Sequence, residues 1–311
     1  MSATALAERT RTEQAPAGKP PTTAARSRVP ALLAAPTLAF LAVFAAYPLL
    51  YILGLAFTDS TLARPLQRWT GFDNFRTALE SQSFTGSLWR TTAFAVLTAL
   101  LQLLAGTALA LLLRARGRRP GLLGTLLLLP LVTPPVMVGV AWKLLLAPTG
   151  GALNSLLHDV GLPAVNPLGS AVPAFLTLVV IDTWQWTPFV MLLVHAALLG
   201  VPDELTEAAA LDGAGPWRTL RSVTLPAIEP TLLSVLLLKL VIGFKVFDLV
   251  YVVTSGGPGF STTTSTFDIQ RTALQEFDVG SAAAATVVFS LLIGAVAGTV
   301  ALRRKRYEEY A

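Results

Sequence analysis

The residues of this chain that could do chemistry are charged side chains set inside long apolar stretches. Lys239, Lys245 and Asp248 fall in one stretch, and Asp182 falls in another. Lys245 and Asp248 are three positions apart, so on a helix they share one face and could form an ion pair. Ionisable groups at membrane depth are costly and mark functional sites. These residues predict a polar lining of a solute pathway. A packing ion pair or a contact to a partner subunit is the alternative.

A second group of candidates lies in the segment Asp182–Phe189, DTWQWTPF. Trp184 and Trp186 offer rings on which the apolar C–H faces of a sugar could stack, and Gln185 and Asp182 offer hydrogen bonds to its hydroxyls. An aromatic belt at the membrane surface is the alternative, and Asp182 could simply reach that surface. The segment therefore predicts either solute contacts or interfacial anchoring.

The sequence contains no arrangement typical of catalysis. It has no cysteine, and its two histidines, His158 and His195, have no carboxylates nearby at metal-ligand spacing. Neither a Ser/His/Asp set nor a carboxylate pair stands out. The nucleotide-binding loop G-x-x-x-x-G-K-[ST] is absent, because the only Gly-Lys pair, Gly18-Lys19, is followed by Pro20. We expect no catalytic residue, no metal site, no bound cofactor and no nucleic-acid partner.

The elements that must position these residues are membrane-spanning helices. Hydrophobic residues make up 53% of the chain, charged residues only 13%, and the mean hydropathy is +0.63, whereas soluble domains carry about 25% charged residues. A spanning helix needs about 20 apolar residues. Six stretches meet this length, and none has the alternation of a barrel strand: 31–57, 88–113, 121–147, 173–199, 230–254 and 280–302. The predicted fold is an all-α polytopic bundle of six transmembrane helices.

Proline and glycine add detail to two parts of this bundle. Prolines predict interrupted or loosened helices in the third and fourth stretches: Pro130, Pro134, Pro135 and Pro188. Gly294 and Gly298, four positions apart in the last stretch, predict a close helix contact within the bundle.

The distribution of Lys and Arg predicts the orientation. Most basic residues outside the stretches fall in 1–30, 114–119, 202–228 and 303–311. Because basic loops remain on the cytoplasmic side, these segments and both termini are predicted to be cytoplasmic. We divide the chain into a disordered tail (1–30), a first helix with its outer loop (31–87), a five-helix transmembrane domain (88–302) and a short C-terminal tail (303–311).

The cytoplasmic segment 202–228 carries the signals of a helical hairpin. Pro202 suits a first helical position, and acidic residues follow it, near the positive end of the helix dipole. Asp212-Gly213 predicts the end of this helix, with Gly213 in the left-handed conformation. Gly215-Pro216 opens a second short helix, which Leu225-Pro226 is predicted to end. A hairpin that only caps the bundle is the alternative to a docking element.

The spacing within this hairpin resembles a known motif. Glu207-Ala208-Ala209, three residues, Gly213, nine residues and then Val223-x-Leu225-Pro226 resemble the EAA loop of inner-membrane permeases of binding-protein-dependent ABC transporters. The family pattern usually has Ile where this chain has Val223. YPLLYILGLAFTDS, GFDNF and VTSGGPGFSTTT resemble segments of the carbohydrate-uptake branch, in its first-permease, maltose/glycerol-phosphate type.

The resemblance implies a cytoplasmic EAA loop that docks on an ATPase subunit. The ATPase-coupling residues that it implies are Glu204, Glu207, Ala208, Ala209, Asp212, Gly213, Ala214, Trp217, Leu225 and Pro226. It implies a permease in the plasma (inner) membrane, surrounded by lipid. It further implies ABC ATPase subunits that use ATP and Mg, a second, non-identical permease, and an extracytoplasmic solute-binding protein. The segment 255–264, which the predicted topology puts outside, is predicted to lie near the docking surface for that protein, and a flexible loop is the alternative.

The resemblance also implies a sugar or oligosaccharide as cargo. Glycerol phosphate, a polyamine or a peptide is the alternative. A phosphorylated cargo would want Arg in the pathway, and the only Arg inside a stretch is Arg90, at an outer edge. A proton-coupled carrier would leave the EAA loop unexplained, and a membrane-embedded enzyme would need a catalytic constellation that is not found.

Overall fold

The chain is built almost entirely from helices. The structure, a computed structural model, describes residues 29–115 and 121–310. Two units, Met1–Leu50 and Tyr51–Ala311, are described separately. The elements are α1 (Val29–Leu41), η1 (Ala42–Ala46), α2 (Tyr47–Ala56), β1 (Thr58–Asp59), β2 (Arg68–Trp69), α3 (Asp73–Glu80), α4 (Gln82–Ala115), α5 (Gly121–Leu127), α6 (Leu129–Val132), α7 (Pro135–Leu145), α8 (Ala152–Asp159), α9 (Ala171–Leu199), α10 (Asp203–Leu211), α11 (Pro216–Thr219), η2 (Leu220–Thr224), α12 (Leu225–Phe244), α13 (Asp248–Val253), α14 (Ser265–Leu274) and α15 (Val279–Tyr310).

Most of the predicted spans appear as long apolar helices. Within the described ranges, five helical segments are long and apolar enough to cross a membrane: Ala34–Ala56, Gln82–Ala115, Ala171–Leu199, Pro216–Phe244 and Val279–Thr299. The predicted third stretch is divided into α5, α6 and α7, and Pro134 lies at the break before α7. This interruption confirms the prediction from its prolines. The total of six spans stays a prediction.

The ends of the chain differ in what the structure describes. Of the predicted N-terminal tail, residues 1–28 lie outside the described residues, whereas Val29 and Pro30 already begin α1. At the other end, α15 continues without a break from the last predicted span to Tyr310.

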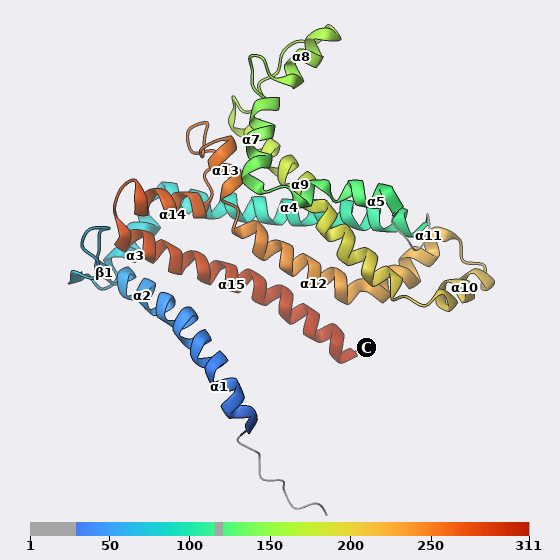
Figure 1. The fold of residues 1–311 in the computed structure, drawn as a ribbon, viewed down its shortest axis with the longest axis horizontal. Coiled ribbons are helices and arrows are strands. Elements are labelled where there is room, and N and C mark those ends of the chain that lie inside the picture. The colour runs from blue at the N-terminus through green and yellow to red at the C-terminus, as the bar shows by residue number, and fades with distance from the viewer. Residues whose placement is uncertain (1–28, 116–120, 311) are drawn as a thin grey trace, which may run out of the picture. The chain divides into compact units, whose positions relative to one another are not determined.

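The scaffold of the second unit is the pair of long helices α4 and α9. They pack along one another, and α12 lies beside both (Figure 1). Small residues allow this close approach. A Cβ placed on Gly106 of α4 would lie 2.7 Å from Cβ of Val190 and 2.9 Å from the backbone N of Met191. Real Cβ atoms do not approach so closely, so a side chain at 106 would force α4 and α9 apart.

Gly106→Val is therefore expected to destabilise the bundle by about 1–3 kcal/mol, the usual cost of overpacking a core. Gly294→Val is the matched control, because a Cβ at Gly294 would meet no heavy atom within 4 Å. The thermal midpoints of the two detergent-purified variants measure the difference. Equal losses in both variants would contradict this explanation.

The prediction that Gly294 and Gly298 make a close contact is wrong for the described residues, since both positions are open.

The helices α3, α14 and α15 pack beside α4 and α12. A Cβ on Gly243 of α12 would lie 2.9 Å from Cα of Ala95, so this crossing also depends on glycine. α15 contacts α12, α14 and α3. α10 and α11 lie at the end of the unit opposite to α3 and α14 (Figure 1). The fold thus separates a protruding hairpin from a loop-rich end, with long helices between them.

Candidate functional site

The hairpin after α9 has the geometry that its sequence predicts at the Gly213 turn. Gly213 has φ +75°, in the left-handed region. Its N–H donates to the carbonyl of Ala210 at 3.0 Å, and the N–H of Ala214 donates to the carbonyl of Ala209 at 2.9 Å. These two bonds form a Schellman cap, which satisfies the last carbonyls of α10. Asp203 and Glu204 lie in the first turn of α10, as predicted.

The second half of the hairpin does not end where the sequence predicts. α11 begins at Pro216 and passes through the π-helical segment η2 directly into α12, so Leu225-Pro226 does not stop the helix. Proline lacks an N–H and clashes with the carbonyl four residues earlier. The wider π turn, with its i→i+5 spacing, lets the helix continue past Pro226.

The hairpin presents apolar side chains to its surroundings. Leu211 is 90% exposed and Trp217 is 73% exposed. Of the other residues in the predicted coupling set, Ala209, Ala214 and Leu225 are half-buried, and the exposed ones are Glu204, Glu207, Ala208, Asp212, Gly213 and Pro226. Exposed large apolar side chains on a short protruding element are typical of a docking surface. We call the surface formed by α10 and α11 the coupling surface.

Arg114 ties the coupling surface to the scaffold. Its Nη1 donates to the carbonyl of Leu198 at 2.9 Å, and its Nη2 lies 3.5 Å from Oδ1 of Asp203. The last turn of α4 is thereby linked both to the end of α9 and to the first residue of α10. From the sequence, Arg114 contributes only to the predicted orientation. The contact could have been suggested by a basic residue at the end of one predicted helix and acidic residues in the first turn of another.

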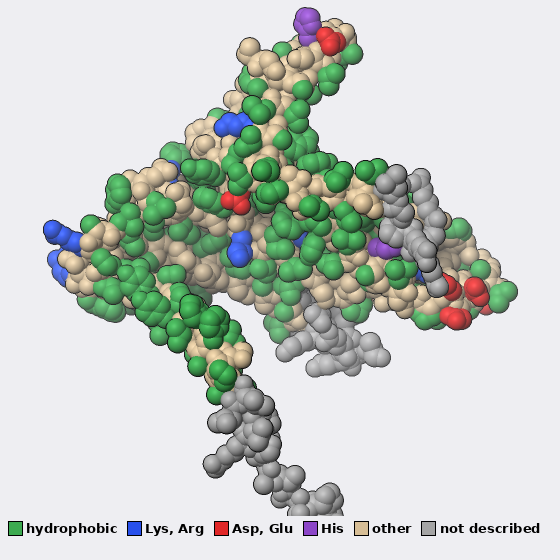
Figure 2. Space-filling view, in the orientation of Figure 1, with side chains coloured by type: hydrophobic (Ala, Val, Ile, Leu, Met, Phe, Trp, Pro, Cys, Tyr) green, Lys and Arg blue, Asp and Glu red, His purple; other side chains and the backbone are tan. Residues whose placement is uncertain are grey.

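Between α9, α12 and α13 lies a pocket of about 230 Å³. Its lining includes five of the predicted pathway residues and the first residue of α7: Asp182, Gln185, Trp186, Lys245, Asp248 and Pro135. Charged side chains are few in the otherwise hydrophobic middle of this face (Figure 2). We call this feature the pathway pocket.

A buried polar cluster stands behind the pathway pocket. Nε2 of Gln102 donates to Oδ2 of Asp182 at 2.8 Å and to the Asp182 carbonyl at 3.1 Å. Nζ of Lys239 lies 4.2 Å from the ring centre of Trp186, a cation–π contact. Lys239 is 2% exposed and Asp182 is 8% exposed. An acidic and a basic side chain are thus held inside the bundle, the first by an amide and the second by an aromatic ring.

Gln185 has a structural as well as a lining role. Its Nε2 donates to the carbonyl of Thr133 at 3.1 Å. Thr133 lies at the break between α6 and α7, so its carbonyl has no helical partner. Neither this contact nor Gln102 was anticipated from the sequence, because both bonds join residues far apart in the chain.

The structure differs from the sequence-based expectations for these helices in three places. Lys245 and Asp248 do not share a helix face, because α12 ends at Phe244 and α13 begins at Asp248, and no ion pair joins them among the described residues. Trp184 does not line the pathway pocket but packs edge-on against Trp142, with ring centres 5.7 Å apart. α9 continues through Pro188 instead of loosening there.

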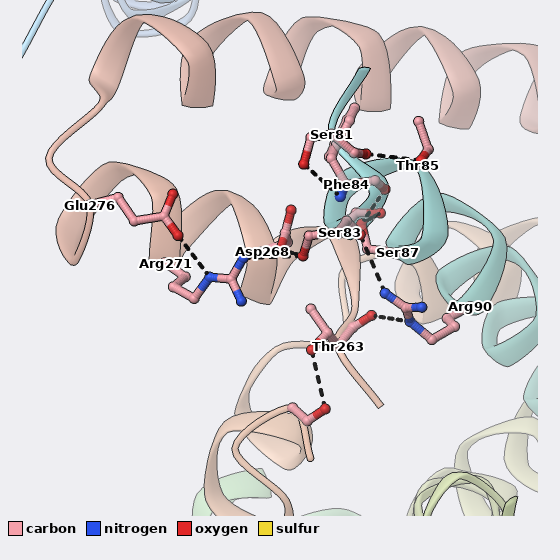
Figure 3. Close-up of polar contacts among 12 residues, drawn as sticks. Ser81, Ser83, Phe84, Thr85, Ser87, Arg90, Thr263, Asp268, Arg271 and Glu276 are labelled. Atoms are coloured by element: carbon pink, nitrogen blue, oxygen red, sulfur yellow. Dashed lines mark hydrogen bonds and ion pairs between the residues drawn. The ribbon is translucent and has the colours of Figure 1, made fainter. Parts of the chain in front are cut away.

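A polar network joins α4 to α14 at the loop-rich end of the unit (Figure 3). Oγ of Ser83 donates to Oδ1 of Asp268 at 2.5 Å, and Nη2 of Arg271 donates to the same carboxylate oxygen at 3.0 Å. Nε of Arg90 donates to the carbonyl of Thr263 at 2.9 Å. Arg90 is therefore engaged by the backbone and does not line the pathway pocket.

Taken together, long apolar helices, a pocket with charged side chains between them and a protruding hairpin define an α-helical membrane transport component. The chain matches the family of binding-protein-dependent transport system inner membrane components over residues 102–306, and it belongs to that family. It is a membrane permease subunit of an inner membrane, and not an enzyme in its own right.

Several proteins of known identity resemble the chain along most of its length. It is 32% identical to the trehalose/maltose transport system permease protein MalF of Thermococcus litoralis, over 81% of this chain and 85% of that protein. It is 32% identical to the sn-glycerol-3-phosphate transport system permease protein UgpA of Escherichia coli O157:H7, over 86% of this chain and 91% of that protein. A chain of a bacterial ABC transporter involved in the import of alginate has the same fold, with a TM-score of 0.80 at 23% identity, covering 90% of this chain and 96% of that one.

Proposed function

We propose that the chain is the permease subunit of an ATP-driven importer and forms half of the pathway for a sugar or oligosaccharide. The observation that carries this proposal is the pairing of a Schellman-capped, exposed coupling hairpin with a charged pocket inside the bundle. Membership of the binding-protein-dependent family supports it.

The coupling surface is the proposed docking element for an ATPase subunit on a separate chain. Leu211 and Trp217 supply the apolar anchors, and aromatic anchors carry much of the energy in protein interfaces. ATP and Mg would be held by that partner. The basic loops support a cytoplasmic location for this surface and for both termini. Conformational change would reach the bundle through α11 and α12 and through the Arg114 contacts.

Leu211→Asp is expected to reduce uptake about tenfold, because burying a leucine is worth about 1.5–3 kcal/mol and a charge there opposes docking. The matched control is Leu156→Asp on α8, where the leucine is 65% exposed. Uptake per unit of membrane-inserted chain measures both. A similar loss at Leu156 would show that any exposed charge harms the chain, and would remove the special role of Leu211.

The pathway pocket is proposed as half of a solute site that a second, non-identical permease completes. Its volume of about 230 Å³ is below the roughly 300–1,000 Å³ of ordinary ligand sites. Lys245 and Asp248 are exposed on this unit without a mutual ion pair. Charges at membrane depth do not face lipid, so a polar pathway and a protein partner are the surroundings that fit them.

The proposed cargo is a sugar. Trp186 offers a ring face, while Asp182, Gln185 and Asp248 offer carboxylate and amide groups for hydroxyls. The trehalose/maltose relative and the relative named as a diacetylchitobiose uptake permease support this class. In this class of importer, a solute-binding protein outside the membrane would deliver the cargo.

The test is uptake of radiolabelled maltose, trehalose, diacetylchitobiose and sn-glycerol-3-phosphate by cells that carry the chain with its own partner subunits. Accumulation of one sugar, lost when the partner ATPase is inactivated, is the expected result. Accumulation of glycerol phosphate alone would show that the cargo is glycerol phosphate and not a sugar. Uptake that persists without the ATPase would overturn the importer itself.

A further inference from the structure

The chain leaves its helical path beside the pathway pocket at three residues that are not themselves helix breakers. α12 ends at Phe244 and α13 begins at Asp248, so Lys245, Val246 and Phe247 lie outside both helices. None of these three residues is a proline or a glycine, and all of them are compatible with a helix. Something elsewhere in the fold must therefore hold the break open.

Two threonines from a distant segment supply the missing contact. In a continuous helix, the carbonyl of Val246 would accept the N–H of residue 250. Here it accepts the hydroxyl of Thr266 at 2.5 Å and that of Thr264 at 3.3 Å. Thr264 is 2% exposed, and its hydroxyl also lies 3.2 Å from that of Thr266. The break leaves the Val246 carbonyl without a helical partner, and the two threonine hydroxyls supply its hydrogen bonds.

The threonines are themselves fixed to the scaffold helix α4. The backbone N–H of Ser265, between them, donates to Oγ1 of Thr91 at 2.8 Å. Arg90 holds the preceding carbonyl, that of Thr263 (Figure 3). Since α4 is one of the longest and best-packed helices of the unit, it provides a rigid base from which the two hydroxyls hold Val246.

We propose that Thr264 and Thr266 are positioning residues, which hold the Lys245–Phe247 break open so that Lys245 and Asp248 line the pathway pocket. The positioning role depends on the proposed function only for the identification of the pathway pocket as a solute site. Without the hydroxyls, the freed carbonyl would regain a helical partner by extending α12 into α13. That extension would turn Lys245 and Asp248 away from their present positions.

The absence of cysteine in the chain permits a direct test. Lys245→Cys introduces the only thiol of this chain. Its reaction with a charged, water-soluble methanethiosulfonate is followed on this chain in membranes that contain the full transporter. In this background, Thr264→Val with Thr266→Val is expected to change the labelling rate about fivefold or more, since a shift of 1–2 kcal/mol changes a population 5- to 30-fold. Thr264→Ser with Thr266→Ser keeps the hydroxyls and should restore the rate.

Thr262→Val is the matched control, because its hydroxyl bonds to Thr254 and the Gly257 carbonyl within the loop and not to the break. A separate His158→Cys reporter, at an exposed side chain on α8, controls for access of the reagent, and the thermal midpoint of each purified variant shows whether it is folded. An unchanged rate at Lys245→Cys in a folded double valine variant would overturn the proposal. An equal change from Thr262→Val would also overturn it.

The same reporter separates this role from the proposed function. Maltose, added with the solute-binding protein, is expected to slow labelling of Lys245→Cys when the pocket takes a sugar. If the threonine variants change the rate but none of the sugars tested in uptake protects the thiol, the positioning role stands and the assignment of the pocket to a sugar fails.

Discussion

Gly213→Pro in the assembled transporter is expected to lower solute uptake about a hundredfold, equivalent to roughly 3 kcal/mol, while the chain still inserts into the membrane. Proline fixes φ near −65° and has no N–H. Gly213 has φ +75° and donates its N–H to the Ala210 carbonyl. The substitution therefore removes the cap of α10 and redirects the chain between α10 and α11, so Leu211 and Trp217 no longer form one surface.

Gly213→Asn is the matched control, because asparagine tolerates the left-handed region better than other side chains. A Cβ at Gly213 would also meet no heavy atom within 4 Å. We expect this variant to keep most of its uptake. ATP hydrolysis by the purified complex should lose its stimulation by the loaded binding protein in Gly213→Pro but not in Gly213→Asn. Full stimulation in Gly213→Pro would contradict the assignment of the hairpin to coupling.

Glu207→Lys, which reverses an exposed charge on α10, should show the same uncoupling.

The second large effect is expected in the buried cluster behind the pocket. Asp182→Asn keeps an acceptor for Gln102 but removes a carboxylate that interacts electrostatically with Lys239 inside the bundle. Removing one of two buried opposite charges costs about 3–5 kcal/mol. We expect the variant to unfold at a clearly lower temperature in detergent and to transport little.

Lys239→Met in the Asp182→Asn background completes a double-mutant cycle. It removes the orphaned cation, so the double variant should recover about 1–3 kcal/mol relative to Asp182→Asn alone. Thermal unfolding of the four purified chains measures the coupling. Strictly additive losses would show that the two charges do not stabilise one another and that each side chain is held separately.

The coupling hairpin was largely predictable because its signals are local. The acidic first turn, Gly213 and Pro216 act on neighbouring backbone, and the structure has α10, the left-handed turn and α11 in those places. The predicted helix end at Leu225-Pro226 is wrong because the helix continues through this proline. The π-helical turn that accommodates it has no clear signature in the sequence.

The pathway pocket was predictable only in part. Asp182, Gln185 and Trp186 follow the i, i+3, i+4 spacing of one helix face, and all three line the pocket. Trp184 lies between them in sequence and faces another way. The break at Lys245–Phe247 could not be predicted, because hydroxyls from a distant segment stabilise it and the three local residues are compatible with a continuous helix.

The unbroken path from Pro216 to Phe244 has a mechanical consequence. Its 29 residues span about 43 Å at 1.5 Å per residue. One end carries Trp217 on the coupling surface, and the other adjoins the pathway pocket. A rod of this length acts as a lever: a tilt of about 5° at one end displaces the other by roughly 4 Å. A small angular movement at the membrane surface would be enough to reshape a binding site deep within the bilayer.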